Sequence, residues 1–340
     1  MTVDWKIGVE IETMAPRGRS RRDLAEVVAE RVGGRVRRFF LAQSEPSLVP
    51  GRPVFENLTL GFAVERPVAN GGPKVLVARF VDDLTLQDDC DRSAPPKPGW
   101  WRVVGDDPRW LRLCARHGDA TLDLPEAISR FAAVVGTRPE AGPGGMWKIT
   151  DDAGASILIA APLPGERERP CEIVTAPLER DHAAGLEALL EPARELGFTA
   201  PIEGAVHLHF DAAPFRDARA LARLLELYDR HRDVLRAQHN KRCRRLGPTE
   251  PKVLDAVRDP AFSTLAWEDA RERLLALEPS KYVDLNIRNL VYDVGYKHTI
   301  EVRVLPTWLH AEPIVAAMGT FEALLRYALS DAPVDGYSPR

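Results

Sequence analysis

GVEIET, at residues 8–13, shows the alternation on which the predicted fold rests. Glu10 and Glu12 flank Ile11 in this segment, and side chains two positions apart on a β-strand point to the same face. Residues 6–12 therefore predict a strand that carries carboxylates on one face and apolar side chains on the other.

Three further segments repeat this alternation with ionisable side chains on one face. They are CEIVT (171–175, with Glu172), AVHLHF (205–210, with His207 and His209) and TIEVRVL (299–305, with Glu301 and Arg303). A half-exposed strand can carry such charges without any function. Carboxylates that gather on one face repel each other unless cations neutralise them, however, and hard divalent ions prefer oxygen ligands. Because arginine also suits phosphate, the four strands together predict a site for a magnesium-bound nucleotide.

Helical periodicity separates these strands. The predicted helices cover residues 21–32, 181–196, 217–236, 269–277 and 313–329, and further strands are predicted over 74–81, 146–150 and 156–161. The strands occur singly between helices and hairpins, which favours an α+β fold with an antiparallel or mixed sheet. Apart from short strands, residues 35–110 are predicted to be irregular.

The chain shows no convincing domain boundary. We therefore expect a single catalytic domain over 1–340, with a divergent segment at about 35–145 that shapes the substrate pocket. Neither a dinucleotide-binding glycine motif nor a P-loop is present in the sequence.

Composition excludes several classes of protein. The 340 residues include 46 Lys and Arg against 50 Asp and Glu, a formal charge of −4, whereas a nucleic-acid binder needs net positive charge to displace counterions. No run of about 18 apolar residues predicts a membrane span, and the N-terminus lacks the pattern of a secretory signal. The cysteines are scattered without C-x-x-C spacing, which is typical of reduced thiols. We expect a cytoplasmic protein that binds neither nucleic acid nor membrane.

The motifs, in this order, resemble the amidoligase family, whose fold is that of glutamine synthetase and glutamate–cysteine ligase. The matching segments are GVEIE (8–12), WKITDD (147–152), CEIVTAPL (171–178), GAVHLHFD (204–211), KYVDLN (281–286) and TIEVRVLPTW (299–308), with a looser match at WWRVVGDD (100–107). The resemblance implies a curved, mainly antiparallel sheet with active-site residues on its concave face and helices packed outside. It also implies ATP-dependent joining of a carboxylate to an amine through an acyl phosphate.

The resemblance also implies roles for individual residues. The implied ligands of Mg²⁺, or of Mn²⁺ in its place, are Glu10, Glu12, Glu172, His207 and Glu301. Arg303 is implied as a catalytic residue that contacts phosphate, and His209 as a contact of either the nucleotide or the metal. Glu172 is in addition a weak choice for the catalytic base.

A basic segment follows the long predicted helix, and it reads QHNKRCRR at 238–245. Asn240 and Arg242 are candidates for binding the nucleotide phosphates or a substrate carboxylate, and Lys281 is a similar candidate. The alternative is a solvated basic helix end. Ala176-Pro177 and Pro306-Thr307 depart from the family pattern, which predicts an altered substrate pocket beside an unchanged metal site.

Two other functions remain open. One is a guanidino kinase-like phosphoryl-transfer enzyme on the same scaffold, and the other is a catalytically silent module that binds a peptide. For the ligase, the expected substrates are small-molecule or peptide carboxylates and amines, and the oligomeric state is left open. Without Mg²⁺, the acidic face is expected to be electrostatically strained.

Overall fold

The computed structural model describes residues 3–46, 54–68, 72–105, 107–239, 246–295 and 297–339. The chain forms two compact units. Unit 1 comprises Met1–Ile11, Thr175–Glu191 and Gly204–Arg340, and unit 2 comprises Glu12–Val174 and Pro192–Glu203. Strand β1 (Ile7–Met14) and helix α4 (His182–Glu195) contribute residues to both. None of the described helices combines the length and apolar character that crossing a membrane would need.

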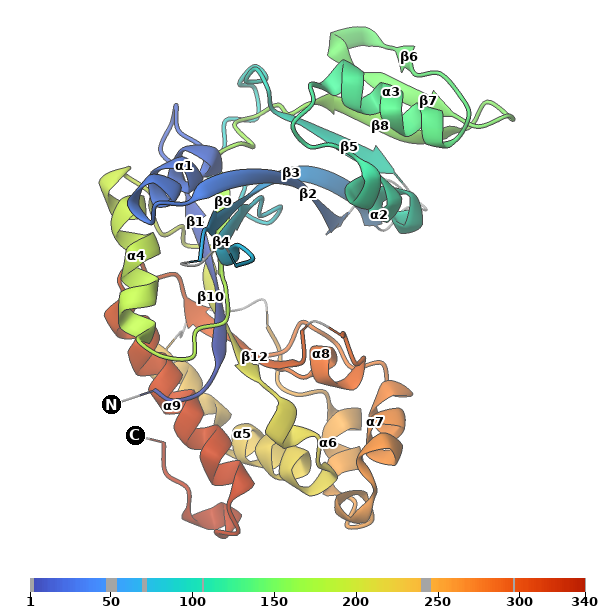
Figure 1. Cartoon of the computed structure of the whole chain (residues 1–340). Helices are drawn as coiled ribbons and strands as arrows, with labels where there is room; N and C mark the ends of the chain where they lie inside the picture. The colour runs from blue at the N-terminus through green and yellow to red at the C-terminus, as the bar shows by residue number, and fades with distance from the viewer. Residues whose placement is uncertain are drawn as a thin grey trace. The chain divides into compact units, whose positions relative to one another are not determined.

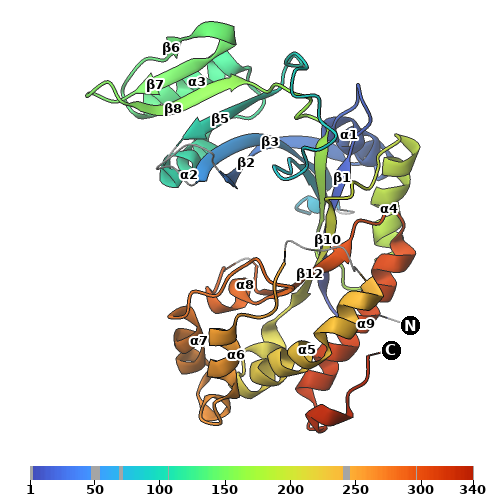
Figure 2. The same cartoon turned by 180° about the vertical axis from the view of Figure 1, so that it is seen from behind.

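Unit 1 contains the start of β1 and most of the helices. Its other elements are β10 (Ala205–Asp211), α5 (Ala218–His239), α6 (Pro251–Arg258), α7 (Trp267–Leu275), β11 (Leu285–Asn286), α8 (Arg288–Val291), β12 (Thr299–Pro306) and α9 (Ala311–Leu329). The strand order is β11-β12-β10-β1, and the three pairs are antiparallel. Figures 1 and 2 show α5 and α9 side by side in this unit, and the two helices pack against each other.

The core of unit 1 uses alternate residues of these strands. Val9, Leu208 and Val302 lie in neighbouring strands and are at most 1% exposed. Helix α5 contributes Leu221, Leu224, Leu225 and Tyr228, all fully buried. Because every second strand residue points into this core, the residues between them must face the other side of the sheet.

The pairing of β10 with β12 is irregular between Val206 and Leu208. Leu208 pairs with Val302, and Val206 pairs with Leu305, so β12 supplies one residue more than β10 between these two pairs. An extra residue of this kind is a β-bulge, which bends the strand and redirects its side chains.

Unit 2 contains the longer strands. Its elements are α1 (Arg21–Arg31), β2 (Arg35–Pro46), β3 (Val54–Arg66), β4 (Val75–Val81), β5 (Trp101–Gly105), α2 (Pro108–His117), α3 (Leu124–Val134), β6 (Glu140–Ala141), β7 (Trp147–Thr150), β8 (Ser156–Pro162) and β9 (Pro170–Thr175). The strand order is β1-β9-β4-β3-β5-β8-β7-β6, with β2 paired to β3. Figure 1 shows β2 and β3 as long curved strands.

An aromatic cluster fills one face of the unit 2 sheet. Phe40 of β2 contacts Trp101 and Phe131, with ring centroids 5.4 and 5.8 Å apart. Phe62 of β3 contacts Trp100 at 5.5 Å, and Phe40 and Phe62 point to the same face, because Phe40 pairs with Leu60 two residues before Phe62. Helix α3 therefore packs through Phe131 onto the face that the β2–β3 hairpin buries.

The structure confirms the α+β class and the antiparallel sheet. The five predicted helices occur within two residues of their expected bounds, except that α5 extends to His239. The expectation of an irregular segment over 35–110 is wrong, because β2 and β3 pair there over twelve consecutive positions. The adjacent Arg37-Arg38 and Phe39-Phe40 obscure the alternation in β2, and only pairing with β3 fixes which side chain faces inward.

Candidate functional site

Strand register brings the predicted residues of unit 1 together. Glu10 of β1 lies directly opposite His207 of β10. His209, two residues further along β10, lies opposite Glu301 of β12. Asn286 of β11 lies opposite Glu301 from the other side. The two glutamates and two histidines form one group on the face of the sheet opposite the core. We call this group the Glu–His cluster, and its members are Glu10, His207, His209 and Glu301.

The side chains of the Glu–His cluster are largely shielded from solvent. His207 and His209 are each 5% exposed and Glu301 is 4% exposed, and the Glu10 side chain is 15% exposed. Ionisable side chains are rarely buried to this extent unless they are paired. The burial therefore argues against the interpretation of these residues as ordinary surface charges.

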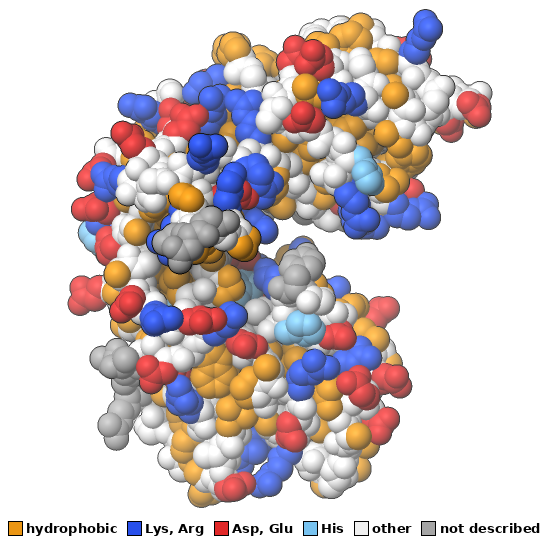
Figure 3. All heavy atoms as spheres, viewed as in Figure 1, with side chains coloured by type: hydrophobic (Ala, Val, Ile, Leu, Met, Phe, Trp, Pro, Cys, Tyr) orange, Lys and Arg blue, Asp and Glu red, His pale blue; other side chains and the backbone are white. Residues whose placement is uncertain are grey.

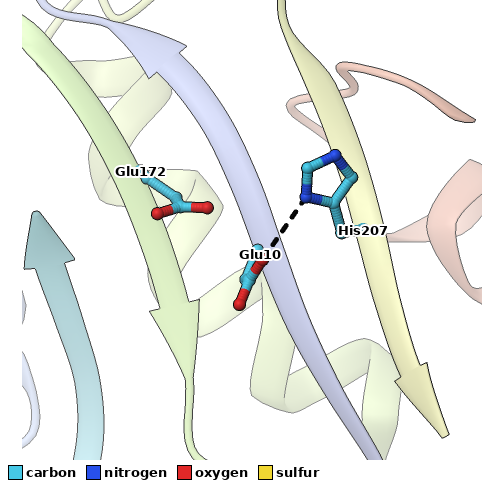
Figure 4. Close-up of side chains that lie close together, drawn as sticks. All are labelled: Glu10, Glu172 and His207. Carbon is cyan, nitrogen blue, oxygen red and sulfur yellow. Dashed lines mark hydrogen bonds and ion pairs between the residues drawn. The ribbon is translucent and has the colours of Figure 1, made fainter. Parts of the chain in front are cut away.

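Glu10 contacts three potential cations. Its Oε2 lies 3.3 Å from Nδ1 of His207, and the two side chains point toward each other (Figure 4). Its Oε1 lies 3.1 Å from Nε2 of His209. Lys297, just before β12, donates from Nζ to the same Oε1 at 2.9 Å. Both oxygens of Glu10 are thus engaged by nitrogen-bearing side chains.

Glu301 is held in a similar way. Arg303 donates to its Oε1 at 2.6 Å, and the amide nitrogen of Asn286 donates to its Oε2 at 2.7 Å. His207 Nδ1 and His209 Nε2 lie 3.7 and 3.9 Å from Oε1. The two histidines therefore lie between two carboxylates, and each carboxylate has its own permanent cation.

The contacts of both carboxylates favour their charged forms. Burial raises the pKa of Glu10, but the charge of His209, the hydrogen bonds from both histidines and the charge of Lys297 outweigh it and hold the pKa well below its usual value. For Glu301, burial likewise raises the pKa, and the charges of His209, Arg303 and His207 outweigh it, so the pKa is lowered. Within unit 1, the neighbouring cations therefore oppose the repulsion between the two carboxylates, and the strain expected without Mg²⁺ stays a prediction.

Hydrogen bonds behind the cluster orient His209. Its Nδ1 lies 3.2 Å from Oγ1 of Thr299, and Asn289 donates to the same hydroxyl oxygen at 3.1 Å. When Nδ1 carries the proton and donates to Thr299, Nε2 directs a lone pair toward the carboxylates. Among the described residues, this Nε2 is a buried atom without a hydrogen bond of suitable geometry.

The donor set fits a divalent cation. Glu10, His209 and Glu301 each offer one ligand atom, and these atoms all lie within 4.8 Å of one another. Two carboxylates and an imidazole suit Mn²⁺, while Mg²⁺ prefers the carboxylates. The Nε2 of His209, which lies 3.1 Å from Oε1 of Glu10, is the imidazole atom that faces the carboxylates in this set.

A buried ion pair anchors the strand that carries Arg303. The backbone N–H of Arg303 donates to the carbonyl of Asp284 at 2.9 Å. The fully buried carboxylate of Asp284 accepts from Arg232 at 2.6 Å and from Arg236 at 2.9 Å, both on α5. Nearby, burial raises the pKa of Tyr228, so its hydroxyl stays neutral. This arrangement fixes the backbone from which Arg303 reaches Glu301.

Of the remaining predicted residues, the structure describes Glu12, Glu172 and Lys281. Glu12 is buried on β1 and Glu172 is half-buried on β9, and both belong to unit 2, so their roles as ligands stay predictions. Lys281 is exposed, with its ammonium 5.3 Å from the ring centroid of Tyr282, and the structure does not bring it to the cluster. Asn240 and Arg242 lie outside the described residues.

Four residues of the site were missed at the level of sequence. They are Asn286, Asn289, Lys297 and Thr299. Lys297 and Thr299 continue the alternation of Glu301 and Arg303 toward the N-terminus, so the pattern K-x-T-x-E-x-R could have indicated them. Nothing in the sequence marks Asn286 or Asn289, because their contacts depend on the fold between β11 and β12.

A comparison with known protein families agrees with the family resemblance seen in the sequence. A family model described as "Putative amidoligase enzyme" matches residues 3–325. The chain belongs to this amidoligase family. The matched range includes all of unit 2, most of unit 1 and every residue of the Glu–His cluster. No curated protein and no solved structure matches the chain.

Proposed function

We propose that this amidoligase-family protein joins a carboxylate to an amine in an ATP- and Mg²⁺-dependent reaction. The observation that carries the proposal is the buried Glu–His cluster, in which Glu10, His209 and Glu301 offer converging ligand atoms. Family membership supports the ligase class. A glutamine synthetase-like fold, with Mn²⁺ as a substitute for Mg²⁺, belongs to the same proposal.

The residues of unit 1 have distinct roles in this reaction. Glu10, His209 and Glu301 would hold the divalent ion, and His207, whose Nδ1 lies 3.3 Å from Glu10, stays a proposed further ligand. When bound, the ion supplies positive charge that neutralises the phosphate oxygens of ATP. Arg303 adds a fixed cation, and its Nε is a buried atom without a hydrogen-bond partner among the described residues. A phosphate oxygen is a suitable acceptor for such a donor.

The chemistry requires two displacements. The substrate carboxylate attacks the γ-phosphorus of ATP, which forms an acyl phosphate and releases ADP. The amine then attacks the acyl carbon, loses a proton and expels inorganic phosphate. Arg303 would stabilise charge on the transferred phosphoryl group. Glu172 is the proposed base for the amine proton, and Glu12 and Glu172 are proposed as further ligands. Asn240, Arg242 and Lys281 stay proposed contacts of the nucleotide.

Glu10→Gln and Glu301→Gln test the proposal. Each change keeps the size of the side chain and removes a ligand charge, so we expect ATP turnover with Mg²⁺ to fall by about 100-fold or more. Turnover is measured as ADP and phosphate release with panels of carboxylates and amines, and the folded state is checked by thermal melting. Glu268→Gln is the matched control, because Glu268 is 64% exposed and pairs with Arg216 and Arg271, away from the Glu–His cluster.

The products separate the ligase from its alternatives. A ligase releases one ADP and one phosphate for each amide formed, whereas a guanidino kinase-like enzyme forms a phosphorylated guanidine and releases no phosphate. A peptide-binding module shows no nucleotide binding in the presence of Mg²⁺. Full turnover by either glutamine variant would contradict the assignment of the metal site.

A further inference from the structure

Lys297 contacts the Glu–His cluster in a way that the roles given above do not explain. Its ammonium lies 2.9 Å from Oε1 of Glu10, the same oxygen that lies 3.1 Å from Nε2 of His209. The Lys297 side chain is 36% exposed and the Glu10 side chain 15% exposed. The partly exposed Lys297 therefore reaches the Glu10 oxygen that lies beside His209, another ligand of the proposed metal site.

The alternation before and within β12 explains this reach. Lys297, Thr299, Glu301 and Arg303 are spaced two residues apart, and all four contact residues of the same face. Lys297 and Arg303 therefore lie on either side of Glu301 along the chain. Lys297 then pairs with the carboxylate of β1, while Arg303 pairs with the carboxylate of its own strand.

The four permanent charges at the metal-free site cancel. Glu10 and Glu301 carry one negative charge each, and Lys297 and Arg303 carry one positive charge each. A divalent ion on both carboxylates leaves the group with a surplus of positive charge. A polyphosphate is the ligand that balances this surplus, and an ammonium is a compact charge that binds phosphate well.

We propose that Lys297 is a second phosphate-contacting residue, whose ammonium pairs with Glu10 until a divalent ion takes that carboxylate. This proposal rests on the proposed function. Lys297 competes with the ion in the absence of nucleotide and cooperates with it once ATP is present. The same side chain therefore has opposite effects on the affinity for the metal alone and on turnover.

The test compares Lys297→Met and Lys297→Arg with the wild-type protein. Without nucleotide, we expect Lys297→Met to bind Mn²⁺ about two- to fivefold more tightly, the effect of removing one partly exposed ion pair, as measured from the electron paramagnetic resonance of free Mn²⁺. With ATP and Mg²⁺, the same variant should show a higher KM for ATP and at least about tenfold lower turnover. Lys297→Arg, which keeps the charge, should retain wild-type Mn²⁺ affinity and part of the turnover.

A matched control is available in the same unit. Lys252 is 46% exposed and pairs with Glu250 at 3.3 Å, so Lys252→Met removes a similar surface ion pair and should change neither measurement. Thermal melting establishes that each variant is folded, and Lys297→Arg keeps the proposal testable if Lys297→Met does not fold.

The measurements distinguish failure of the Lys297 proposal from failure of the proposed function. Unchanged or weaker Mn²⁺ binding by Lys297→Met overturns the competition with the metal, and unchanged turnover overturns the phosphate contact. If the wild-type protein binds Mn²⁺ but turns over no ATP, the proposed function fails, while the Mn²⁺ comparison still decides whether Lys297 competes for Glu10. If the wild-type protein binds no Mn²⁺ at all, both proposals fail.

Discussion

Glu10 and Glu301 are buried carboxylates that stay charged because each has a cation of its own. Lys297 is paired with Glu10 and Arg303 with Glu301, and the histidines lie between them. Burial alone would favour the protonated form of a carboxyl group. The lowered pKa values show that the surrounding charges outweigh burial. At the scale of single residues, the site is therefore prepared for a cation before one binds.

These pKa shifts predict an acid-sensitive stability. Because the folded pKa values of Glu10 and Glu301 lie below the ordinary value of 4.5, the unfolded chain binds more protons in that range and stability rises with pH. The stabilisation is fully present above about pH 4.5 and is lost as the pH falls through the folded values. Urea titrations of the metal-free protein between pH 3 and 7 should show this loss.

Glu10→Gln provides the comparison for this pH dependence. The variant lacks one of the two titrating groups, so its free energy of unfolding should fall less steeply on acidification than that of the wild-type protein. Equal slopes for the two proteins would contradict the assignment of the shift to Glu10.

The four residues of the Glu–His cluster could be predicted from the sequence. The alternation of charged and apolar positions was enough to group Glu10, His207, His209 and Glu301, with Arg303 beside them, because strand periodicity determines which face they share. Lys297 could not be assigned in this way. It precedes β12, and its contact with Glu10 depends on how β1 and β12 are placed on either side of β10.

At the scale of elements, the ion pair between α5 and the residue before β11 connects a helix to the site. Asp284 is fully buried between Arg232 and Arg236, and its carbonyl accepts from the backbone of Arg303. Removing one partner of a buried ion pair leaves uncompensated charge. Helix α5 therefore contributes to the position of Arg303 without contacting the Glu–His cluster through these residues.

Asp284→Asn tests this connection. The change leaves two half-buried arginines without the charge of their buried carboxylate, so the free energy of unfolding should fall by about 3 kcal/mol in a urea titration. Asp229→Asn is the control, because Asp229 forms a partly exposed pair with Arg258 at 2.7 Å, and its loss should cost less than about 1 kcal/mol. Equal losses for the two variants would contradict the role of burial at Asp284.

In the β2–β3 hairpin, the sequence of β2 alone does not determine which face of the strand each side chain occupies. Arg37 pairs with Glu65 of β3 at 2.6 Å, whereas the next residue, Arg38, belongs to the opposite face of the strand. Two adjacent arginines followed by two adjacent phenylalanines give no clear alternation. The partner strand decides the orientation of each side chain, so this hairpin could not be derived from the segment alone.

At the scale of the whole molecule, charge is distributed without a dominant sign. Lys and Arg side chains are interspersed with Asp and Glu on the face shown in Figure 3, in keeping with a formal charge of −4. The local balance within the Glu–His cluster repeats this near neutrality on a smaller scale. The total charge of the chain therefore gives no indication that a cation site exists.

Stabilisation by ligands provides a test on the whole chain. A ligand that binds only the folded state raises its stability, by about 2.7 kcal/mol at a concentration 100 times its Kd. We therefore expect Mg²⁺ together with ATP to raise the thermal midpoint of the wild-type protein, as followed by differential scanning fluorimetry. Glu301→Gln should abolish most of this increase. An equal increase in both proteins would place the binding of Mg²⁺ and ATP elsewhere.

The bulge between β10 and β12 has a consequence for how the site can lose its arginine. Val206–Leu305 and Leu208–Val302 are core pairs on either side of the bulge, and Arg303 is one of the two residues of β12 between them. Loss of the codon for Arg303 would make the pairing regular and leave both core pairs in place. A single in-frame deletion is therefore expected to remove the fixed cation of the site while both core pairs of the sheet are kept.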